Sequence, residues 1–187
     1  MNITVYLGSS FGNEAAYKEA AEEVGRWIAR RGHRLIYGGS GVGLMGVLAD
    51  TVLAGGGEVI GVEPRFFLDA GLEHTGITKT IPTDTMAERR TIMLEMGSAY
   101  IALPGGSGTL DEISEAIVLA GLGKHEKPCI LYNKIGFYDP LLEVYDRMRA
   151  AGFLKESVRE RILCASSPED LDRILCVSDP KAPDRIF

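Results

Sequence analysis

Short apolar segments and longer amphipathic segments alternate along almost the whole chain, and this order constrains the fold more than any other feature. We expect strands at residues 3–7, 34–37, 58–62, 79–81, 100–103 and 128–132. We expect helices at about 14–31, 46–54, 84–96, 109–122 and 140–151, and a final one from Ser167. Strands that alternate with helices pair in parallel, because each crossover needs a helix to return the chain. The sequence therefore predicts an α/β fold with a doubly wound parallel sheet and helices on both faces.

The size and composition favour one domain. The chain has 187 residues, of which 45% are hydrophobic and 25% charged, as in ordinary globular domains. We expect this domain to span residues 1–177. Residues 178–187, with two prolines and several charges, predict a loosely ordered tail.

Charge and cysteine usage exclude several classes of function. A net charge of −6 argues against a nucleic-acid partner, since phosphate backbones are bound by clustered Lys and Arg. No apolar run approaches the ~20 residues of a membrane span, and no signal peptide is visible, so we expect a cytoplasmic protein without a membrane partner. Cys129, Cys164 and Cys176 have neither C-x-x-C spacing nor nearby histidines. They predict buried thiols in a reducing compartment, with no disulfide and no metal site.

A glycine-rich turn follows the strand predicted at residues 100–103. It reads Pro104-Gly-Gly-Ser-Gly-Thr109, so Gly105, Gly106, Ser107, Gly108 and Thr109 lead into the next helix. Glycines let the backbone approach a ligand closely, and the free amides at a helix N-terminus favour an anion, of which phosphate is the expected one. The competing interpretation is a capping box, with Thr109 as the N-cap and Glu112 bonding back to it.

Two further loops should lie at the same edge of the sheet, because each also follows a strand. Gly8 and Ser9 follow the first strand and offer amides and a hydroxyl. Residues 38–46, which include Gly43 and Met45, contain a G-x-G-x-x-G pattern with the acidic Glu63 downstream. That pattern is a dinucleotide fingerprint, but here it follows the second strand rather than the first. We therefore favour a smaller nucleotide over NAD(P).

Candidate catalytic side chains flank the glycine turn. Arg89 lies one helical turn from Met86 and from Met93, on a partly apolar stripe that is unusual for a solvated arginine. Glu112 falls in the first turn of the following helix, where the dipole favours its ionised form. A carboxylate there could stabilise an oxocarbenium-like transition state or accept a proton from water. We also expect Arg90 and Asp111 to contact the ligand, and Glu73 to contact ribose hydroxyls or the base.

In these motifs the chain resembles the LOG (LONELY GUY) family, often labelled lysine decarboxylase. The resemblance covers nearly the whole chain and is carried most specifically by Met86-Ala-Glu-Arg-Arg90 and by Pro104-Gly-Gly-Ser-Gly-Thr-Leu-Asp-Glu112. It implies a Rossmann-like fold and hydrolysis of the N-glycosidic bond of cytokinin riboside 5′-monophosphates, without a cofactor. It also implies that Arg89 and Glu112 are catalytic, that residues 105–109 bind phosphate, and that Arg90 and Glu73 bind substrate.

The chain departs from the family pattern at positions that are expected to form the pocket for the base. Many cytokinin-activating members have tyrosine where this chain has Ser107, and Thr-Trp-Ala-Gln where it has Val118-Leu-Ala-Gly121. The preference for a prenylated adenine over plain AMP is therefore open, and a nucleosidase of broader specificity is one alternative. The other is a protein that binds a nucleotide or phosphorylated cofactor without cleaving it. A pyridoxal-phosphate decarboxylase is disfavoured, because neither loop carries a suitable lysine.

Two of the predicted helices look too apolar to have a solvated face. They cover residues 44–54 and 113–122. Each is expected either to be buried on two sides within the monomer or to form a subunit interface. We favour a homodimer.

Overall fold

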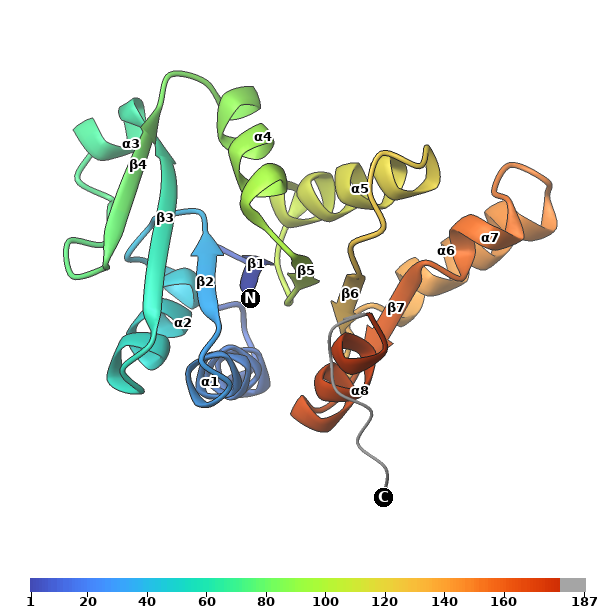
Figure 1. Ribbon diagram of the computed structural model, residues 1–187, viewed down its shortest axis with the longest axis horizontal. Helices are drawn as coiled ribbons and strands as arrows, with labels where there is room; N and C mark the ends of the chain where they lie inside the picture. The colour runs from blue at the N-terminus through green and yellow to red at the C-terminus, as the bar shows by residue number, and fades with distance from the viewer. Residues whose placement is uncertain (179–187) are drawn as a thin grey trace.

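The computed structural model describes residues 1–178, and its centre is one parallel sheet of seven strands. Their order is β4-β3-β2-β1-β5-β6-β7, so the chain moves outward from β1 and then returns to the other side of it (Figure 1). This confirms the predicted doubly wound α/β fold. The predicted tail lies outside the described residues, except for Ser178, the last residue of a helix. The strands are β1 (Asn2–Tyr6), β2 (Arg34–Tyr37), β3 (Glu58–Pro64), β4 (Lys79–Thr83), β5 (Ala99–Ala102), β6 (Cys129–Tyr132) and β7 (Ile162–Ala165).

Helices cover both faces of the sheet, and each face has its own apolar core. One core joins the sheet to α1 (Ala15–Arg30), α2 (Gly43–Ala54) and α8 (Pro168–Ser178). The other joins it to α4 (Met86–Met96), α5 (Ser107–Gly121) and α6 (Asp139–Ala150). Two short helices, α3 (Arg65–Asp69) and α7 (Glu156–Arg159), complete the described chain.

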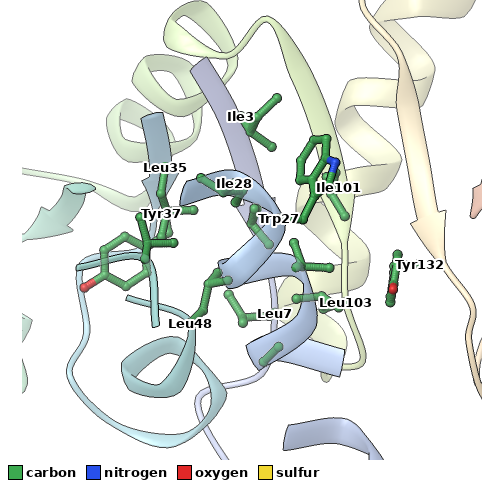
Figure 2. Close-up of a cluster of buried hydrophobic side chains, with 14 of the residues drawn as sticks. Ile3, Leu7, Trp27, Ile28, Leu35, Tyr37, Leu48, Ile101, Leu103 and Tyr132 are labelled. Carbon is green, nitrogen blue, oxygen red and sulfur yellow. The ribbon is translucent and has the colours of Figure 1, made fainter. Parts of the chain in front are cut away.

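The core beneath α1 shows how the sequence pattern produces the packing. Trp27 and Ile28 of α1 lie against Ile3 and Leu35 of the sheet, and all four are at most 2% exposed (Figure 2). Burying each large aliphatic side chain stabilises the fold by about 1.5–3 kcal/mol. The indole Nε1 of Trp27 donates a hydrogen bond of 2.9 Å to Asp172, which ties α1 to α8.

The loops after β1 and β5 meet at the point where the strand order reverses. The Gly8 amide donates to the Pro104 carbonyl oxygen at 3.2 Å. A Cβ at Gly105 would lie 2.8 Å from the Gly8 nitrogen, so only a glycine allows this approach. Ligands of doubly wound sheets bind in the crevice at such a reversal. The glycine turn therefore lies where the topology places a binding site.

Several expectations from the sequence were wrong. The strand β7 and the helices α3 and α7 were missed, because segments of four or five residues are too short to show a period. The cysteines were expected to be buried, but only Cys129 is, whereas Cys164 and Cys176 are exposed. Cys164 belongs to β7, which is an edge strand of the sheet.

Within residues 1–178 no helix has the length and apolarity to cross a membrane. The same residues hold no cluster of His, Cys, Asp and Glu side chains that fits a metal ion.

Candidate active site

Helix α5 begins two residues earlier than the sequence predicts, and this changes the interpretation of its N-terminus. Its first residue is Ser107, with Gly106 as an N-cap that provides no side-chain bond. The capping box of Thr109 and Glu112 is therefore wrong. Among the described residues, no protein acceptor bonds the amides of Ser107, Gly108 and Thr109. Three free amides at the positive end of a helix of 15 residues form an anion site.

These amides face a cavity of about 340 Å³ at the reversal of the sheet. Its walls come from the loops after β1 and β5 and from α2, α3, α4 and α5. The lining residues are Leu7, Gly8, Ser9, Met45, Phe67, Met86, Arg89, Arg90, Gly106, Ser107, Gly108, Thr109, Asp111 and Glu112.

Arg89 and Glu112 form a buried ion pair in the wall of this cavity. Nη1 of Arg89 donates to Oε1 of Glu112 at 3.0 Å, and the two side chains are only 10% and 9% exposed. Nε of Arg89 donates to the Val62 carbonyl oxygen at 3.0 Å, which fixes the plane of the guanidinium. A side chain at Gly38 would collide with Nη2, so that glycine makes room for the arginine.

The environment of Glu112 makes its carboxylate more reactive than an exposed one. Burial raises the pKa of Glu112, and the neighbouring Arg89 opposes that rise. A desolvated carboxylate is a stronger base than one in water, because its charged form is less well solvated. Arg89 and Glu112 come from different helices, α4 and α5, and lie beside the free amides of α5. The arrangement can bind a phosphorylated ligand and perform acid–base chemistry next to it.

Arg90 lies at the mouth of the cavity and bridges the same two helices. Its side chain bonds Glu115 at 3.1 Å and pairs with Asp111 at 3.3 Å. These partners are partly exposed, so the pairing is worth little energy and a ligand could displace it.

The remaining predicted residues divide into two groups. Gly8, Ser9 and Met45 line the cavity, although the Gly8 amide already bonds Pro104 and is not free for a ligand. Three others do not line it. A side chain at Gly43 would collide with the Ser9 backbone, Glu73 forms a β-bridge with Ser40, and Gly105 packs against Gly8.

Sequence reasoning missed three apolar lining residues, namely Leu7, Phe67 and Met86. Phe67 lies on the overlooked helix α3, and Met86 was assigned to the stripe beside Arg89. Their apolar surface suits the flat face of a base. Only their position next to the polar residues identifies them, because isolated apolar residues carry no sequence signal for ligand binding.

The contact at Gly105 leads to a testable expectation. We expect Gly105→Ala to lower the free energy of unfolding by about 1–3 kcal/mol, as overpacking does. The new methyl group would lie 2.8 Å from the Gly8 nitrogen and even closer to the Thr109 hydroxyl. Urea unfolding measures the loss. The matched control is Gly108→Ala, where nothing lies within 4 Å and no loss is expected. Equal stability of both variants would show that the two loops do not touch.

The fold and the candidate site together define a Rossmann-like α/β protein with a crevice suited to a phosphorylated ligand. The model of a family described as "possible lysine decarboxylase" matches residues 45–175. The chain belongs to this family and, within it, to the LOG proteins.

Relatives of known name support the assignment. The cytokinin riboside 5′-monophosphate phosphoribohydrolase of Rhodococcoides fascians is 40% identical over 169 residues, which are 90% of this chain and 85% of that protein. The cytokinin riboside 5′-monophosphate phosphoribohydrolase LOG of Oryza sativa subsp. japonica is 41% identical over 169 residues, 90% of this chain and 70% of that protein.

Solved structures show the same fold at lower identity. The molybdenum cofactor binding protein of Rippkaea orientalis superposes with a TM-score of 0.71 at 24% identity, over 95% of this chain and 96% of that chain. The Moco carrier protein of Chlamydomonas reinhardtii gives a TM-score of 0.67 at 20% identity, over 93% and 94% of the two chains. At such identity the likeness establishes the Rossmann-like fold alone.

Proposed function

We propose that the protein is a phosphoribohydrolase that cleaves the N-glycosidic bond of cytokinin riboside 5′-monophosphates, giving the free base and ribose 5-phosphate. The observation that carries the proposal is the pairing of buried Arg89 and Glu112 beside the three free amides of α5. The relatives that are named for this activity support it.

In the proposed reaction each part of the cavity has a role. The amides of Ser107, Gly108 and Thr109 bind the 5′-phosphate and so hold the sugar beside Glu112. The electron pair of the C1′–N bond leaves with the base, and water adds to C1′. Glu112 stabilises the developing ribosyl cation and accepts the proton of the water, while the base takes a proton from solvent. Arg89 orients the substrate and supports the departing base.

The apolar lining determines how the base is held. Met45, Phe67 and Met86 provide an apolar wall for the adenine ring. Ser107 offers a small hydroxyl where many relatives of the family have a tyrosine, which leaves more room above the ligand. We infer that the pocket accepts both plain and N6-modified adenine.

Product analysis tests this function. Purified protein incubated with isopentenyladenosine monophosphate should release isopentenyladenine and ribose 5-phosphate, both measured by chromatography. AMP is the second substrate, and adenosine, which lacks the phosphate, is the control that should remain intact. Binding of AMP without release of any base over hours would contradict hydrolysis and favour a nucleotide carrier.

We propose further that the protein acts in the cytoplasm as a homodimer. Helix α5 exposes an apolar surface that a second copy would cover. It consists of Leu110 and Val118 on the helix and Leu122 at its C-cap, which are 40%, 56% and 67% exposed. The apolar residues of α2, in contrast, are mostly buried within the monomer. Free cysteines suit a reducing compartment. A light-scattering mass of one 20.2-kDa chain would contradict the dimer.

A further inference from the structure

A second carboxyl group lies close to Arg89, at a position to which the proposed reaction assigns no role. Glu63 is the sixth residue of β3 and is only 1% exposed. Among the described residues, its Oε2 atom has no hydrogen-bond partner. A buried and unpaired carboxyl oxygen is costly, so its retention in the core calls for an explanation.

The backbone brings Glu63 and Arg89 together. Nε of Arg89 bonds the carbonyl oxygen of Val62, the residue directly before Glu63. Two consecutive glycines make room for the two side chains. A Cβ at Gly38 would collide with the guanidinium, and a Cβ at Gly39 would lie 2.8 Å from Cβ of Glu63 and 3.0 Å from its Oε2. Gly39 also has φ of +90°, which other residues rarely adopt.

The groups around Glu63 come from three elements and from the loop before β4. Arg89 of α4 is the cation, and Glu73, before β4, is the second acid, with a buried Oε2 that is also unpartnered. Tyr37 of β2 stays neutral, because burial raises its pKa and the charges of Glu63 and Asp50 of α2 add to that rise. Burial raises the pKa of Glu63 to about 7, although Arg89 opposes the rise and Glu73 adds to it.

We propose that Glu63 is a positioning residue that acts on the reaction through Arg89, by setting how much of the guanidinium charge is available to Glu112 and the departing base. This rests on the proposed function. When Glu63 is neutral, Glu112 is the one carboxylate within residues 1–178 whose charge Arg89 balances at close range. When Glu63 is ionised, a second negative charge lies near Arg89 and offsets part of its positive charge. Arg89 then stabilises the departing base less well.

The test compares Glu63→Gln with the wild type across pH. The ratio of kcat in Glu63→Gln to kcat in the wild type should rise by about tenfold from about pH 6 to about pH 8.5, the effect of an interaction of about one pKa unit, with little change in KM. The ratio isolates Glu63, because the ionisation of Glu112 affects the rate of both enzymes. The matched control is Glu58→Gln on the same strand, which removes an exposed carboxylate that pairs with Arg34 and should leave the profile unchanged.

A second readout does not depend on catalysis. The Nε–H signal of Arg89 in a nitrogen-15 NMR spectrum should shift through about pH 7 in the wild type and stay constant in Glu63→Gln. A wild-type shift that persists in Glu63→Gln, or a pH profile identical to the wild type, would overturn the inference. If the wild type releases no base, the proposed function fails, and the Arg89 signal alone decides whether Glu63 is coupled to it.

Discussion

Glu112→Gln is expected to lower kcat by ~10²–10⁴-fold while KM for the nucleoside monophosphate changes little. The amide keeps the shape of the side chain and can still accept a hydrogen bond from Arg89, but it cannot take a proton from water or stabilise a cation by charge. The phosphate site on the α5 amides remains intact, so binding should persist. Initial rates of base release measure the change.

The control for this variant is Glu115→Gln, on the same helix and one turn away, where the side chain is 40% exposed and pairs with Arg90. It should keep most of the wild-type rate. Glu112→Gln with wild-type turnover and a native circular-dichroism spectrum would show that this carboxylate does not take part in the chemistry.

Arg89→Ala should lose activity by a similar factor and should also destabilise the fold. Removal of one partner of a buried ion pair leaves the other charge uncompensated, which costs about 3–5 kcal/mol. Glu112 would be that charge, because its side chain is 9% exposed and would lose the hydrogen bond that Arg89 donates to it. Urea unfolding at neutral pH measures the stability, and base release measures the rate.

The neighbouring arginine provides the comparison. Arg90 pairs with Asp111 and Glu115 at the mouth of the cavity, so Arg90→Ala should cost only about 0–1 kcal/mol. The double variant Arg89→Met/Glu112→Leu should recover much of the stability lost in Arg89→Ala but none of the activity, since no buried charge remains. Equal stability of Arg89→Ala and Arg90→Ala would contradict the buried pair.

The sequence predicted the fold class and most elements, because long periodic helices and local caps carry their own signal. Thr85 accepts a hydrogen bond from the Glu88 amide at 3.1 Å, and Ser167 accepts one from the Asp170 amide at 3.2 Å, both at predicted helix starts. The glycine turn was correctly placed at the end of β5, since parallel strands end at one edge.

What the sequence could not predict are contacts between distant segments. Thr109 and Glu112 fit a capping box locally, but burial of Glu112 against Arg89 of another helix overrides that pattern. Glu63 matched the acidic residue expected downstream of a dinucleotide fingerprint, whereas in the fold it is a buried neighbour of Arg89. The apolar wall from Phe67 depends on α3, a helix of five residues that no periodicity reveals.

The proposed reaction depends on one contact: the free amides of α5 hold a phosphate and thereby place the sugar beside Glu112. A crystal structure of Glu112→Gln with AMP tests it most directly, because the slow variant should retain intact substrate. We expect phosphate oxygens within hydrogen-bond distance of the amides of Ser107, Gly108 and Thr109, with C1′ next to the side chain of residue 112 and Arg89 near the base. A phosphate bound elsewhere, or a glycosidic bond remote from residue 112, would contradict it.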